Sequence, residues 1–150
     1  MQFTDEVNWG PADFAIFGLM LFGACGAYEL AARMTGNRVY RAAVALALLT
    51  AFLLIWVTLA VGIIGDEGNP ANLMFGGVLC IGIVSAFIAR FRASGMALAL
   101  LATALAQTLV AVIAFVAGWG NASALTVIFV VLWLASAWLF HRAARRAATA

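Results

Sequence analysis

Residues 42–64 read AAVALALLTAFLLIWVTLAVGII, a run of apolar residues without a single charged side chain. A helix of about 20 such residues can cross the hydrocarbon core of a bilayer, which is about 30 Å thick. Arginines precede the run, and the acidic, glycine-rich segment GDEG follows it. The stretch therefore predicts a transmembrane helix, and its neighbours decide how many more the chain contains.

Four further apolar runs approach the same length, and the connections between successive runs are short. Helices joined by short connections pack as antiparallel neighbours. The sequence therefore predicts an all-α, polytopic transmembrane bundle of five spans, forming one domain over residues 1–150. The four other runs cover residues 12–32, 71–89, 96–118 and 124–140.

The overall composition agrees with a chain that is surrounded by lipid. Hydrophobic residues make up 67% of the sequence and charged residues 9%, with a mean hydropathy of +1.11. Soluble domains are about half apolar and about a quarter charged. The formal net charge is only +2, whereas nucleic-acid binding needs a concentrated basic face. We expect membrane lipids as partners and no nucleic acid.

The eight arginines fall into three groups, after the first, third and fifth spans. Five spans place all three groups on one side of the membrane, whereas a model without the span at 71–89 separates them. Arginine-rich loops lie on the cytoplasmic side. The sequence therefore predicts an outside N-terminus and a cytoplasmic C-terminus. The groups are Arg33, Arg38 and Arg41; Arg90 and Arg92; and Arg142, Arg145 and Arg146.

The segment before the third span, residues 65–74, reads GDEGNPANLM and contains Asn69-Pro70-Ala71. Water and glycerol channels carry two such boxes on opposed half-helices, whereas this chain has one. Asparagine is a good helix N-cap, and proline suits the first helical position. We therefore predict that the box begins the third helix. Asp66, Glu67, Asn69 and Asn72 also form a candidate site for a cation or a partner loop, although a solvated turn explains the same composition.

Glu29 is a candidate functional residue because ionisable groups are rare inside membrane helices. It lies near the inner end of the first span, and Arg33 follows four residues later. Side chains spaced in this way are neighbours on a helix surface. We predict a structural ion pair between the two residues.

Gln107 lies near the middle of the fourth span and is the deepest strongly polar side chain. Its amide needs hydrogen-bond partners in a hydrocarbon environment, so it is expected to face the interior of the bundle. We predict a hydrogen bond between helices, the alternative being a polar step along a solute path. The partners considered for it are Thr50, Thr58 and Ser85.

Small residues recur at four-residue spacing in three of the spans. Such stripes let helix backbones approach closely in a membrane, where leucine burial contributes little. We predict that they mark contact faces, within one chain or between chains. The stripes are Gly23, Ala27 and Ala31; Gly82 and Ala86; Ala102 and Ala106; and Ala114 and Gly118.

Catalytic, metal-binding and cofactor-binding patterns are not recognisable in this sequence. His141 is the only histidine and lies at the inner end of the fifth span. Cys25 and Cys80 each lie inside an apolar run, where we expect them as small core residues. We therefore expect a protein that is not an enzyme and that holds neither a metal nor a cofactor.

Three stretches together carry a resemblance to other proteins: LLIWVTLAVGIIGDEGNPANLMF, IARFR and LWLASAWLFHRAAR. From the second span onward the chain resembles an uncharacterised family of small bacterial multi-pass integral membrane proteins. The resemblance implies residence in the bacterial inner (plasma) membrane and supplies no activity or functional residues. Tryptophan-rich sensory proteins are similar in length and span number, but their tryptophan- and proline-rich signatures are missing here.

Three functions remain open at this point. The favoured one is a non-enzymatic membrane protein that acts through helix packing, as a homo-oligomer or as an accessory subunit of a larger membrane complex. The second is a small-solute or ion transporter or channel, with Gln107, Glu29 and the acidic loop along its route. The third is a membrane protein that binds a lipid or a quinone.

Overall fold

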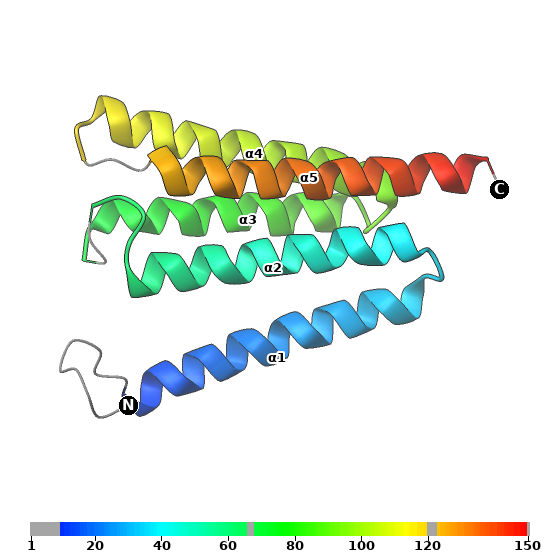
Figure 1. Ribbon diagram of the computed structural model, residues 1–150, viewed down its shortest axis with the longest axis horizontal. Coiled ribbons are helices and arrows are strands. Elements are labelled where there is room, and N and C mark those ends of the chain that lie inside the picture. The colour runs from blue at the N-terminus through cyan, green and yellow to red at the C-terminus, as the bar shows by residue number, and fades with distance from the viewer. Residues whose placement is uncertain (1–9, 66–67, 120–122, 150) are drawn as a thin grey trace.

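The computed structural model describes residues 10–65, 68–119 and 123–149, and every regular element in these ranges is a helix (Figure 1). Five stretches, with η1 and α3 taken together, are long and apolar enough to cross a membrane. The prediction of five apolar helices is therefore confirmed for this part of the chain. The elements are α1 (Pro11–Met34), α2 (Arg38–Ala60), the 3-10 helix η1 (Pro70–Asn72), α3 (Leu73–Ile88), α4 (Ala93–Val116) and α5 (Ser123–Ala148).

Helices α2 to α5 form a bundle with its own interior, which we call the core bundle. Its most extensive contact joins α4 to α5, while α2 packs on α5 and α3 packs on α4. Helix α1 lies along one side of this bundle and packs mainly on α2 (Figure 1). None of its residues is buried. The hydrophobic interior is therefore built without α1.

The seam between α4 and α5 follows a seven-residue pattern. Its buried positions recur three and four residues apart on both helices, which is the spacing of helices packed almost antiparallel with interdigitating side chains. Because α4 ends at Val116 and α5 begins at Ser123, Gln107 and Trp133 lie nearly level. The buried positions with this spacing are Leu100, Thr103, Gln107, Val110 and Ala114 on α4, and Thr126, Phe129, Trp133, Ser136 and Phe140 on α5. Among them, Thr103 also approaches α3, while Ser136 and Phe140 contact α2.

Two helix boundaries differ from the predicted spans. Helix α2 ends at Ala60, because Gly62 takes a left-handed conformation with φ 77° and its N–H bonds to the Val57 carbonyl. Glycine after the last turn is a common helix stop. Helix α5 continues to Ala148, well past the predicted end at residue 140. The alanines and arginines of this extension are strong helix formers, so the helix continues through them.

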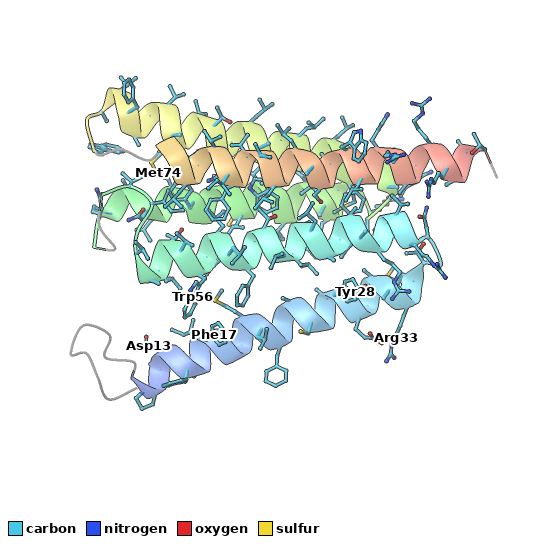
Figure 2. The ribbon with its side chains drawn as sticks, viewed as in Figure 1. Asp13, Phe17, Tyr28, Arg33, Trp56 and Met74 are labelled. Atoms are coloured by element: carbon cyan, nitrogen blue, oxygen red, sulfur yellow. The ribbon has the colours of Figure 1, made fainter. Side chains whose placement is uncertain are left out.

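Aromatic contacts attach α1 to α2. The Phe17 ring meets Trp56 edge-on, with ring centroids 4.9 Å apart, and it meets Phe52 at 5.6 Å. Figure 2 shows Phe17 and Trp56 in the space between the two helices.

Cys25 on α1 and Cys80 on α3 are both free and exposed. The expectation that these cysteines are core residues is therefore wrong.

The two ends of the bundle differ in charge. The α1–α2 connection, the α3–α4 connection and the C-terminal turns of α5 lie at the same end (Figure 1). All eight arginines lie in these segments or in the helix turns next to them, and we call this the arginine end. The turn before α3 and the C-terminal end of α4 lie at the other end (Figure 1), where Asn69 bonds to the Trp119 carbonyl. We call this the NPA end.

Candidate functional site

Asn69 at the NPA end caps a short helix. Its side-chain oxygen Oδ1 accepts a hydrogen bond of 3.0 Å from the Ala71 N–H, and Pro70 occupies the first helical position. The helix-start interpretation of the box is therefore confirmed. The helix that it starts is η1, one 3-10 turn, and α3 follows from Leu73.

Asn72 closes the connection between α2 and α3 from inside. Its side chain is buried, and its Oδ1 accepts hydrogen bonds from the N–H groups of Ile63 at 3.0 Å and Ile64 at 2.9 Å. Its Nδ2 also donates to the Ile64 carbonyl at 3.4 Å. The side-chain amide of Asn72 therefore hydrogen-bonds to the backbone of the same chain.

A shallow cavity of about 500 Å³ lies beside this turn. The Asn69 Nδ2 donates to the Trp119 carbonyl at 3.3 Å, which ties the turn to the end of α4. Asp66 and Glu67, the carboxylates of the candidate loop site, lie outside the described residues. Ion or partner binding at this loop therefore stays a prediction. The cavity is lined by Asn69, Pro70, Ala71, Met74 and Trp119.

Glu29 and Arg33 form the expected ion pair on α1. The Arg33 Nε donates to the Glu29 Oε1 at 2.8 Å, and both side chains are more than half exposed. Arg33 lies on the side of α1 that faces away from α2 (Figure 2). The predicted pair is confirmed, and it lies on the outer surface of the chain near the arginine end.

Gln107 is completely buried in the core bundle, so the prediction that it faces the interior is confirmed. The hydrogen bond that we expected between helices is not formed. Neither Oε1 nor Nε2 of Gln107 has a hydrogen-bond partner among the described residues. Thr50 and Thr58, two of the expected partners, donate instead to the carbonyls of Leu46 and Leu54 on their own helix.

Three buried polar residues of α5 were missed by the sequence analysis. Ser136 donates to the Ala43 carbonyl of α2 at 2.8 Å and so makes a hydrogen bond between helices. The Trp133 Nε1 and the Thr126 Oγ1 are buried and, within the described ranges, have no hydrogen-bond partner. Thr126 and Trp133 are seven residues apart, which places them on one helix face. This seven-residue spacing is the sequence pattern that could have identified them as buried together.

The candidate residues do not come together in one site. Glu29 lies on the outside of α1, Asn69 and Asn72 lie in the turn before α3, and Gln107 lies inside the core bundle. A solute route through Glu29, Gln107 and the acidic loop stays a prediction, because Asp66 and Glu67 lie outside the described residues. No three histidine, cysteine, aspartate or glutamate side chains within those ranges are placed to hold a metal ion.

The chain was also compared with known proteins. No family model, no curated protein and no solved structure matches it. Functional arguments therefore depend on the geometry of this chain alone.

Proposed function

We propose that this chain is a multi-pass membrane protein that acts through helix packing, as a homo-oligomer or as an accessory subunit of a larger membrane complex. The association surface is the outer face of α1, which includes Gly23 and Ala27. The supporting observation is that α1 is 24 residues long and buries none of them inside the chain.

The glycines of α1 support the assignment of an association surface to this helix. Glycine inside a helix costs about 0.5–1 kcal/mol relative to alanine, and in membranes close helix contact at small residues offsets that cost. Gly82 has such a contact, because a Cβ there would lie 3.0 Å from the Thr103 Oγ1. Gly23 and Gly26 have no other atom within 4 Å of the same position. The described residues supply no contact that uses them, which supports a contact with another polypeptide.

The orientation belongs to the same proposal. The eight arginines gather at one end of the bundle (Figure 1), and positively charged connections remain in the cytoplasm. This arrangement supports a cytoplasmic C-terminus and an outside N-terminus in the inner membrane of a bacterium.

Cysteine cross-linking in native membranes tests the association surface. In a background with Cys25→Ala and Cys80→Ala, Gly23→Cys is compared with Leu105→Cys, an exposed position at the middle of α4. Oxidation is expected to give a disulfide dimer, or a larger adduct with a partner subunit, from Gly23→Cys only. Equal cross-linking at both positions would show random collision and contradict the proposal.

A matched variant separates association from folding. Gly23→Leu enlarges the outer face of α1 at a position where an added Cβ has no described atom within 4 Å. It is expected to abolish the native oligomer or complex in mild detergent, while the thermal unfolding midpoint of the monomer stays unchanged. A particle of the same size in wild type and Gly23→Leu would count against this surface.

A further inference from the structure

The side chain of Gln107 has a large unused capacity for hydrogen bonding. A carboxamide carries two N–H donors and an oxygen that accepts two hydrogen bonds. All of this capacity is enclosed, because Gln107 has no exposed surface and its amide has no partner among the described residues. Buried polar groups are almost always paired, with protein groups or with ordered water.

Four threonines of α2 and α4 are satisfied in a simple way, whereas the Thr126 Oγ1 of α5 has no partner among the described residues. Four helical threonines donate to the carbonyl four residues earlier, at 2.7–2.9 Å. The glutamine amide is too long and has too many donors to be satisfied by that route. The unpaired atoms are therefore a local feature of the seam between α4 and α5. The four threonines are Thr50, Thr58, Thr103 and Thr108.

Trp133 is buried on α5, and counted along the chain it is about as far from the α4–α5 connection as Gln107 is on α4. Its indole Nε1 is a second donor without an acceptor among the described residues. The only acceptor in this pair of side chains is the Gln107 Oε1, and the structure holds no hydrogen bond between it and the indole N–H. A water molecule both accepts and donates, so it can accept from either N–H and donate to the Gln107 Oε1. An ion is not matched, because no buried side chain in the described ranges is charged.

The positions near Gln107 and Trp133 along their own helices bear on the size of a bound molecule. Thr103 and Ala104 on α4 and Ser136 on α5 are buried and small. Phe129 and Phe140 are buried before and after Trp133 along α5, and the Phe140 ring packs on Tyr40 of α2. An interior filled in this way favours a bound molecule of the size of water over a ring compound.

We propose that Gln107 and Trp133 form a water-binding site in the middle of the core bundle, where bound water satisfies the amide in place of a hydrogen bond between helices. The site does not depend on the association surface of α1. It is made entirely within one chain, so it is present in a monomer as well.

Water-edited NMR of the full chain in lipid nanodiscs tests this site. Tryptophan is labelled with 15N, and Trp133→Phe identifies the indole signal of Trp133. Magnetisation transfer from water to this indole is expected to fall roughly threefold or more in Gln107→Leu, because the leucine cannot hold the water. Thr108→Val is the matched control, since Thr108 is exposed and already bonds to the Ala104 carbonyl. It is expected to leave the transfer unchanged.

Two results would overturn the assignment. One is a Trp133 indole whose transfer from water is equally weak in wild type and Gln107→Leu. The other is an organic molecule that native mass spectrometry detects on the wild type and that Gln107→Leu removes. Gln107→Met repeats the experiment with an unbranched side chain if the leucine variant fails to fold, as judged by its unfolding midpoint.

Discussion

Asn72 shows how much of the NPA end depends on one side chain. Its oxygen is the acceptor for two consecutive backbone N–H groups, those of Ile63 and Ile64, in a buried position. No water reaches these groups from outside. Asn69, three residues earlier, caps a single N–H in a more open position. Asn72 therefore satisfies more backbone N–H groups than Asn69 does.

Asn72→Ala is expected to destabilise the protein by about 2–4 kcal/mol, because each buried N–H left unpaired costs about 1–3 kcal/mol. Asn69→Ala is the matched comparison and is expected to cost about 1 kcal/mol, the usual value of a lost N-cap. Reversible unfolding with SDS in mixed micelles measures both. If Asn69→Ala proves the more damaging of the two, the role assigned to Asn72 is wrong.

Local rules predicted part of this residue-level picture. The cap at Asn69 and the ion pair between Glu29 and Arg33 follow from spacing along one segment, and both are confirmed. Asn72 and Ser136 act on groups brought close by folding. Asn72 bonds to residues across a turn, and Ser136 donates to the Ala43 carbonyl of α2. Their roles could not be read from local sequence because they depend on helix register.

At the scale of helices, the close approach of α3 and α4 depends on Gly82. A Cβ at this position would lie 3.0 Å from the Thr103 Oγ1. Thr103 is fully buried and already bonded to the Ala99 carbonyl, so it has little freedom to move away. The stripe containing Gly82 was correctly predicted as a contact face. Gly23, which begins another stripe, has no such contact with the described residues.

Gly82→Ala is expected to destabilise the protein by about 1–2 kcal/mol, because the added methyl overpacks the contact between α3 and α4. The double variant with Thr103→Ala is expected to be more stable than the sum of the two single changes, since the alanine removes the hydroxyl that the new methyl meets. Gly23→Ala is the control and is expected to be neutral or slightly stabilising. Unfolding free energies of the four variants check the coupling, and strict additivity would refute it.

Helix ends were the least predictable elements. Hydropathy alone extended the second span through residue 64, but the left-handed conformation at Gly62 ends α2 at Ala60. Hydropathy also ended the fifth span at residue 140, whereas α5 continues to Ala148. The length of an apolar run indicates which segment can lie in a membrane. The backbone conformation determines the residue at which the helix ends.

For the whole molecule, the main division lies between α1 and the core bundle. The interior hydrogen bonds and the buried apolar cluster belong to α2–α5 and their connections. Helix α1 contributes the aromatic contacts of Phe17 with Phe52 and Trp56. Each such contact is worth about 0.5–1.5 kcal/mol, which is a small part of the total.

A chain of residues 37–150, which lacks α1, is therefore expected to fold. Its helices should unfold cooperatively, at a midpoint a few degrees below that of the full chain, because only about 1–3 kcal/mol of aromatic contact is lost. Circular dichroism during heating provides the measurement. A chain that ends at residue 119 and so lacks α5 is the control, and it is expected not to fold. Aggregation of the 37–150 chain would contradict the independence of the core bundle.

The unequal lengths of the η1–α3 span and of α4 have a consequence for the surrounding lipid. The η1–α3 span has 19 residues and α4 has 24, which correspond to about 30 Å and about 36 Å along their axes. A hydrocarbon layer of about 30 Å matches the η1–α3 span and is thinner than α4 is long. A helix longer than the layer tilts or thickens the bilayer beside it. The flank formed by α4 would thus favour longer-chain lipids.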